Sequence, residues 1–193
     1  MSYDISLVDP VTKEPLHCEQ PHMIRGGTYA IGGTTELWLN ITYNYAHYYY
    51  EATDGDPRFA HDEVSCYYAD GSKGPIETEY GIRGIYGKTG AESIPMLRDM
   101  IDRITAKYKP DSQNWISTKR KKQRVLDEYG VEHKDAYRLI ISGKPYTTED
   151  YDVEVSEGPC KDYWEPTAAN AIGPLHSLIA MAELRPDGVW DGD

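Results

Sequence analysis

Residues 36–52, ELWLNITYNYAHYYYEA, decide the fold class because their hydrophobic period changes part of the way along. Every second residue from Leu37 to Ile41 is apolar, which is the pattern of a strand with one buried face. Thr42 and Asn44 are both good helix N-caps, and the remainder of the segment reads as a helix. A strand that runs directly into a helix predicts an α+β protein.

The rest of the chain offers two long helices and several short strands. Residues 91–107 carry isoleucine and leucine at helical spacing, which gives one apolar face. Residues 167–184 predict a second helix, which Gly173-Pro174 should kink. Strands or hairpins are expected in three other stretches: 3–8, 22–35 and 53–80. We therefore predict a small, mostly antiparallel sheet packed by about three helices.

The composition narrows the function classes. The chain has 193 residues, a formal net charge of −12 and a pI near 4.9. General nucleic-acid binders show the opposite charge balance, whereas an acidic protein suits basic partners, including proteins whose own ligand is nucleic acid. Three widely spaced cysteines, no apolar run long enough to span a membrane, and no signal peptide predict a cytoplasmic protein without membrane contact.

Residues 81–93, GIRGIYGKTGAES, have the glycines and the Lys88-Thr89 pair of a phosphate-binding loop. That loop needs its first glycine at the position of Ile82, and it needs a buried strand before it. Residues 76–80 are polar instead. We therefore expect a glycine-rich connection into the next helix, with at most a weak anion contact at the helix N-terminus.

Three blocks of sequence occur in the order RGGTYAIGGTTELWLNITYNYAHYYY, GIRGIYGKTGAESIPMLRDMI and YWEPTAANAIGPLHSLIAMAELRPDGVWDGD. In their residues and their order, these blocks resemble a family of small, largely uncharacterised bacteriophage and prophage proteins. The resemblance covers residues 1–52, 80–105 and 163–193. It implies a compact α+β unit and a phage accessory gene that acts inside a bacterial host cell. It supplies no catalytic motif.

The chain departs from that family by additions near residues 53–79 and 106–162. We expect residues 1–105 and 163–193 to form the family-like core domain, and residues 106–162 to form an inserted helical subdomain. The insertion is neutral, with 11 Lys or Arg and 11 Asp or Glu, so the excess negative charge belongs to the core.

A basic run within this insertion is the candidate for nucleic-acid contact. The segment STKRKKQRVLDEYG predicts a capped basic helix that ends at Gly130. Its basic residues are Lys119, Arg120, Lys121, Lys122 and Arg124. Lysine and arginine can bind a nucleic-acid backbone, although the acidic core would oppose a duplex. Residues 135–145 fit either a strand or a short helix, and the acidic segment that follows is β-like.

A polar pocket is the alternative to a protein-binding surface. Its candidate binding residues are Arg25, Asn40, Asn44, His47 and Lys88. His47 and Glu51 are four residues apart and share a helix face, and a histidine–carboxylate pair can support general-base chemistry. No serine or cysteine nucleophile lies beside them. This alternative is a small-molecule or nucleotide binder, or an enzyme with few sequence signals.

Two groups of residues have the side-chain types of metal ligands: His17, Cys18 and His22, and Asp187, Asp191 and Asp193. The first group matches no structural zinc spacing. The second lacks the calcium-loop spacing and its terminal glutamate. We expect no metal, no cofactor and no catalytic residue, and we expect Trp190 to fold back into the core.

The leading expectation is a non-enzymatic accessory protein that binds and inhibits a host protein. Acidic side chains can occupy the lysine- and arginine-lined groove in which a nuclease binds phosphates. The expected partner class is an antiviral defence nuclease, of the CRISPR or restriction type.

Overall fold

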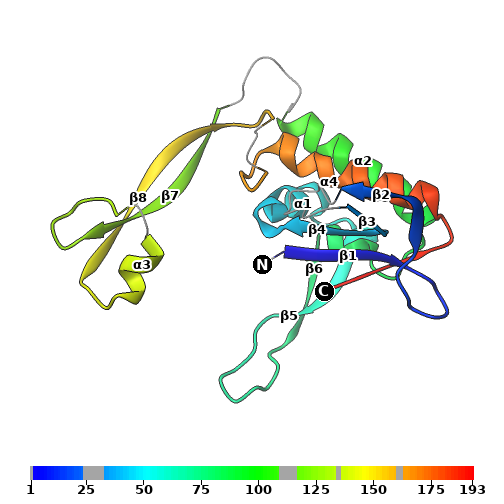
Figure 1. Ribbon diagram of the computed structural model, residues 1–193, viewed down its shortest axis with the longest axis horizontal. Helices are drawn as coiled ribbons and strands as arrows, with labels where there is room; N and C mark the ends of the chain where they lie inside the picture. Colours follow the sequence, from blue (N-terminus) through cyan, green and yellow to red (C-terminus); the bar gives the residue numbers. More distant parts are fainter. Residues whose placement is uncertain (1, 24–32, 109–116, 134–135, 160–162) are drawn as a thin grey trace. The chain divides into compact units, whose positions relative to one another are not determined.

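The structure is a computed structural model that describes residues 2–23, 33–108, 117–133, 136–159 and 163–193 (Figure 1). The chain divides into two compact units. Unit 1 comprises residues 1–113 and 158–193, and unit 2 comprises residues 114–157. Unit 2 lies within the insertion expected at 106–162. It begins later than expected because a helix of unit 1 continues to Tyr108.

The main sheet of unit 1 has three antiparallel strands in the order β4-β1-β9. The strands are β1, Ser2–Val8; β4, Trp38–Thr42; and β9, Val189–Gly192. In β1 the alternate residues Tyr3, Ile5 and Leu7 are fully buried, while the residues between them are half-buried. The sheet therefore has one apolar face, as the alternating pattern predicts. β9 is a strand that the sequence did not indicate.

Three helices of unit 1 pack into the same hydrophobic core as this face (Figure 1). They are α1, Ala46–Thr53, which follows the 3-10 turn η1, Tyr43–Tyr45; α2, Gly90–Tyr108; and α4, Ala168–Leu184. The predicted switch from strand to helix is confirmed, as are both long helices. α4 is one continuous helix that contains Pro174. The α+β class and the small antiparallel sheet are therefore correct.

Tyrosines take the place of phenylalanines in this core because their hydroxyl groups bond to backbone carbonyls. Tyr48 donates to the carbonyl of Pro166 and Tyr49 to the carbonyl of Ala171, each at 2.8 Å. Tyr45 donates in the same way to the carbonyl of Tyr163. Each ring fills apolar space while its hydroxyl group satisfies a backbone acceptor in or before α4.

Unit 1 also contains two smaller two-stranded sheets. Their strands are β2, His17–Met23, paired with β3, Gly33–Glu36; and β5, Ala60–Val64, paired with β6, Ile76–Tyr80. The first pair agrees with the strand or hairpin expected at 22–35, although residues 24–32 lie outside the described part of the chain. The second confirms the hairpin expected within 53–80. Short 3-10 turns flank it: η2, Pro57–Phe59, and η3, Ile82–Ile85.

Unit 2 is mainly a β-hairpin, so the expectation of a helical subdomain is wrong. Its elements are β7, Ser117–Asp127; α3, Ala136–Ile141; and β8, Tyr146–Ser156. The basic segment forms strand β7, which pairs with β8 over all 11 residues. Lysine, arginine and glutamine are good helix formers, but helix propensity is a small energy, and pairing with an oppositely charged strand overrides it.

Candidate functional site

The glycine-rich loop at 81–90 does not form a phosphate cradle, because its N–H groups bond within the chain. The amides of Gly87 and Gly90 donate to the carbonyls of Trp190 and Gly188 at 2.9 and 2.8 Å. At the start of α2, Glu92 Oε2 accepts from the amide of Thr89 at 2.8 Å, and Thr89 Oγ1 accepts from the amide of Glu92 at 3.2 Å. This reciprocal capping box is visible in the sequence as Thr-x-x-Glu. The loop is therefore a connection into a helix, as expected.

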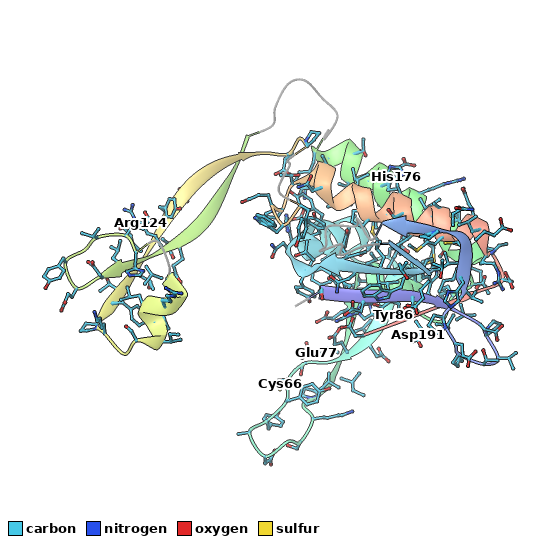
Figure 2. The ribbon with its side chains drawn as sticks, in the orientation of Figure 1. Cys66, Glu77, Tyr86, Arg124, His176 and Asp191 are labelled. Carbon is cyan, nitrogen blue, oxygen red and sulfur yellow. The ribbon has the colours of Figure 1, made fainter. Side chains whose placement is uncertain are left out.

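The β5–β6 hairpin, residues 60–80, extends away from the main sheet of unit 1 (Figures 1 and 2). It contains five Asp or Glu and one Lys. Glu77 and Glu79 form no ion pair with any residue that the structure describes. Tyr67 and Tyr68 near its tip are 68% and 55% exposed, and Ile76 is 70% exposed. The hairpin thus presents negative charge together with exposed apolar side chains.

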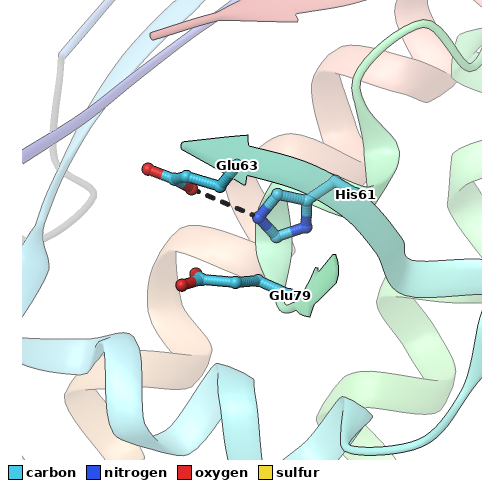
Figure 3. Close-up of side chains that lie close together, drawn as sticks. All are labelled: His61, Glu63 and Glu79. Atoms are coloured by element: carbon cyan, nitrogen blue, oxygen red, sulfur yellow. Dashed lines mark ion pairs between the residues drawn. The ribbon is translucent and has the colours of Figure 1, made fainter. Parts of the chain in front are cut away.

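At the base of this hairpin, one imidazole and two carboxylates converge (Figure 3). His61 lies directly opposite Glu79 across the strand pair, and Glu63 lies two residues beyond His61 on β5. Residues at these positions share one face of a two-stranded sheet. Their ligand atoms all lie within 4.8 Å of one another. His61 Nε2 and Glu63 Oε2 are 3.6 Å apart.

A contact of the Nδ1 atom orients the imidazole of His61. Nδ1 lies 3.4 Å from the carbonyl oxygen of Phe59. A carbonyl can only accept, so Nδ1 carries a hydrogen and Nε2 faces the carboxylates. Nε2 is buried and has no hydrogen-bond partner among the described residues. Nε2 is therefore the ring nitrogen that is directed towards the two carboxylates.

Arg83 and Lys88 bring positive charge to the same region. Arg83 Nη1 donates to Glu63 Oε2 at 2.5 Å, and its Nε donates to the carbonyl of Asp193 at 3.0 Å. Burial of the guanidinium acts to lower the pKa of Arg83. The hydrogen bond to Glu63 and the negative charges nearby together outweigh it, so the pKa lies above its ordinary value. Arg83, Lys88 and His61 line one hollow of about 420 Å³. Lys88 therefore lies beside the cluster and not in a phosphate loop.

Two of the predicted pocket residues instead hold the fold together. Asn40 Nδ2 donates to Asp4 Oδ1 at 2.6 Å and to Ser2 Oγ at 2.8 Å, which ties β4 to β1. Asn44 Nδ2 donates to the carbonyl of Trp164 at 2.7 Å. Neither residue lines the hollow that contains Lys88.

His47 and Glu51, the pair considered for general-base chemistry, each contact a further side chain. The exposed His47 ring lies 3.9 Å from the ring of Tyr48, centroid to centroid. Glu51 accepts a hydrogen bond from Lys107 Nζ on α2 at 2.6 Å. Arg25 lies outside the residues that the structure describes. A pocket formed by these residues stays a prediction.

The basic run of unit 2 faces an acidic strand. The register places Lys119 opposite Glu154, Arg120 opposite Val153, Lys121 opposite Asp152, Lys122 opposite Tyr151 and Arg124 opposite Glu149. Arg124 Nη2 lies 2.8 Å from Glu149 Oε2. Lys121 and Arg124 occupy positions of opposite faces, because their separation of three residues is odd. Arg120, Lys122 and Arg124 share one face, and two of them lie opposite uncharged residues, so the register leaves one face with three basic positions. Nucleic-acid contact here stays a prediction.

The two groups of metal-type residues singled out in the sequence have ordinary contacts where they are described. Cys18 Sγ donates to the carbonyl of Gln20 at 3.0 Å, and His17 Nδ1 lies 2.9 Å from Thr35 Oγ1. Asp187 pairs with Arg185, and Asp193 Oδ1 accepts from the amide of Asp4. The His61 cluster was missed because Glu79 is 18 residues away in sequence. Its signal was a His-x-Glu pair on one strand of a predicted hairpin.

Among the described residues, no helix combines the length and the apolar character that crossing a bilayer requires. Comparisons with protein-family models, with curated proteins and with solved structures found no match.

Proposed function

We propose that this chain is an accessory protein of the phage and prophage kind, which binds and inhibits a host protein. The β5–β6 hairpin is the element that enters the partner. The partner is a nucleic-acid-binding protein of the host, and a nuclease of an antiviral defence system is the class that this chemistry fits. The resemblance of the three sequence blocks supports the phage context, and the shape and charge of the hairpin support the mode of binding.

The observation that carries the proposal is the exposed, negatively charged hairpin. Glu63 lies directly opposite Glu77, and Glu79 follows on the same face, so three carboxylates share that face. Like charges that lie directly opposite each other destabilise a strand pair. Arg83 compensates Glu63, whereas Glu77 and Glu79 have no cation among the described residues. A basic groove would supply the missing positive charge, as it does for phosphates.

The tip of the hairpin supplies the apolar part of such an interface. Interface energy is concentrated in a few residues, among which tyrosine is enriched. Tyr67 and Tyr68 are exposed side by side near the tip. A stable interface uses about 20–30 residues on each side, and the hairpin has 21 residues, from Ala60 to Tyr80. The carboxylates would steer the approach, and the tyrosines would hold the complex.

The test begins with capture of host proteins on the tagged full-length chain, followed by elution with increasing salt. We expect capture of one dominant host protein that binds nucleic acid. Salt between about 0.1 and 0.5 M should release it, because the salt screens surface charges. Added nucleic acid should displace it from the tagged chain. The chain should also inhibit the activity of that protein. A captured protein that nucleic acid does not displace would count against the proposed mode of binding.

Two pairs of variants connect the binding to the hairpin. Glu77→Lys should weaken capture at low salt, and Glu14→Lys, an exposed charge reversal outside the hairpin, should not. Tyr67→Ala should shorten the lifetime of the complex, whereas Tyr129→Ala, which removes an 82%-exposed tyrosine from unit 2, should leave it unchanged. If the controls weaken binding and the hairpin variants do not, the interface lies elsewhere.

A further inference from the structure

We propose that His61, Glu63 and Glu79 form a binding site for a divalent transition-metal cation, with Zn²⁺ as the best fit. This inference does not depend on the proposed function. It rests on three converging ligand atoms, on a buried imidazole nitrogen without a hydrogen-bond partner among the described residues, and on the residues that orient the ligands (Figure 3).

The separation of the ligands suits a metal better than a direct hydrogen bond. His61 Nε2 and Glu63 Oε2 are 3.6 Å apart. An N–H···O bond is shorter, about 2.7–3.2 Å. Two ligands at about 2.0–2.1 Å from a tetrahedral zinc ion are separated by about 3.3 Å. A small adjustment of the Glu63 and Glu79 side chains would bring the three ligands to a common centre.

The orientation of the ligands is already set by neighbouring groups. A metal-binding histidine usually donates its other ring N–H to a carbonyl or carboxylate, and ligating carboxylates are themselves hydrogen-bonded. His61 meets this description because its Nδ1 faces the carbonyl of Phe59 at 3.4 Å. Glu63 meets it through Arg83, whose Nη1 donates to Oε2 at 2.5 Å. Arg83 pairs with Glu63. Among the described residues no cation pairs with Glu79, so its carboxylate is available to a metal ion.

The choice of metal follows from the ligand types. Imidazole nitrogen favours zinc and other late first-row ions over magnesium or calcium, which prefer oxygen ligands alone. Three protein ligands leave a fourth zinc position for water or a small anion. His61 and Glu63 line the hollow that also contains Arg83, Tyr86 and Lys88, so that position has access to positively charged side chains.

The site would also clamp the hairpin. His61 and Glu63 belong to β5 and Glu79 to β6, so a bound ion would cross-link the two strands at the base of the hairpin. It would neutralise two of the three carboxylates on that face. Zinc should therefore protect the hairpin from proteolysis near Cys66 to Ser72.

The experiment is calorimetric titration of the full-length chain, first treated with a chelator, with Zn²⁺ alone. We expect one ion per chain, with Mg²⁺ binding at least 100-fold more weakly. His61→Ala and Glu79→Gln should each weaken zinc binding by about 10- to 100-fold or more. The matched control is Glu77→Gln, which removes an exposed carboxylate from the same face of the same strand as Glu79 and should leave zinc affinity unchanged.

Two further measurements establish whether a cysteine binds the ion and whether each variant folds. Co²⁺ in place of Zn²⁺ should give ligand-field bands without a thiolate charge-transfer band, and Cys18→Ser should not alter them. Circular dichroism of the metal-free variants checks their folding; should His61→Ala fail to fold, Glu79→Gln carries the test. Absence of zinc binding, or an affinity that neither variant lowers, would overturn the inference, as would an equal loss in Glu77→Gln. Salt-sensitive capture of a host protein that persists in Glu79→Gln would leave the proposed function standing.

Discussion

The hydrogen bond between Trp190 and Ser93 offers the sharpest test of how the core of unit 1 is built. Trp190 is 1% exposed and Ser93 is fully buried, and the indole Nε1 donates to Ser93 Oγ at 2.7 Å. Ser93 Oγ in turn donates to the carbonyl of Gly90 at 2.8 Å. The bond therefore joins strand β9 to the first turn of α2, at the point where the chain closes its core.

Ser93→Ala would leave the indole N–H buried without an acceptor. A buried polar group without a partner costs about 1–3 kcal/mol. For a chain of this size, that cost lowers the midpoint of thermal unfolding by roughly 2–12 °C. Trp190→Phe removes the donor and part of the ring, so its cost comes mainly from the cavity left behind. That cost should stay below the roughly 3–5 kcal/mol measured when a large aromatic side chain is truncated to alanine.

The double variant separates the hydrogen bond from the packing. In a Trp190→Phe background no indole N–H remains, so Ser93→Ala should cost at least about 1 kcal/mol less than it does in the original chain. Urea unfolding followed by circular dichroism gives the free energies of all four proteins. If Ser93→Ala costs the same in both backgrounds, the indole contact contributes nothing measurable and the reasoning fails.

Three other predictions concern stability. The pKa of Asp56 lies below its ordinary value, chiefly because Arg58 donates hydrogen bonds to it. The free energy of unfolding should therefore fall as the pH drops from about 4 through this lower pKa. The urea midpoint of Asp56→Asn should fall less steeply with pH than that of the original chain. Gly84→Ala would bring a Cβ within 2.4–2.6 Å of the backbone of Phe59 and should cost at least about 1–3 kcal/mol of stability. Gly173 lies in a helix with open space around it, so Gly173→Ala should stabilise the protein by up to about 1 kcal/mol. Equal urea midpoints for the two variants would refute this contrast. Tyr49→Phe should cost about 1 kcal/mol in the same assay, since it removes a buried hydrogen bond to the carbonyl of Ala171. No loss would show that the hydroxyl bond is neutral.

Segments whose signal is local were predicted from the sequence. The strand and helix within residues 36–52 carry their own hydrophobic periods, and residues 91–107 form the helix that their spacing indicates. Strand β7 could not be predicted in this way. Its basic side chains favour a helix, and its partner strand begins some 20 residues after it ends. Long-range pairing decided its structure.

The same reason explains which parts of the candidate site escaped prediction. Metal ligands are recognisable in a sequence when their spacings are short, as around His17, whereas His61 and Glu79 become neighbours only through the register of a hairpin. Asn40 and Asn44 have the side chains of ligand-binding residues, but in the fold their amide groups satisfy other parts of the chain. Residue type alone does not show where a hydrogen-bonding group will find its partner.

The central position of β1 has a consequence for how the protein is made. One edge of β1 pairs with β4, and among the described residues the other edge pairs only with residues 189–192. A ribosome that adds about 5–20 residues per second needs roughly 10–40 s to reach them after it has finished β1. Throughout that time the nascent chain carries an open strand edge with an apolar face, which invites association with other chains. The order of synthesis therefore makes the closing of this sheet one of the last events in the folding of unit 1.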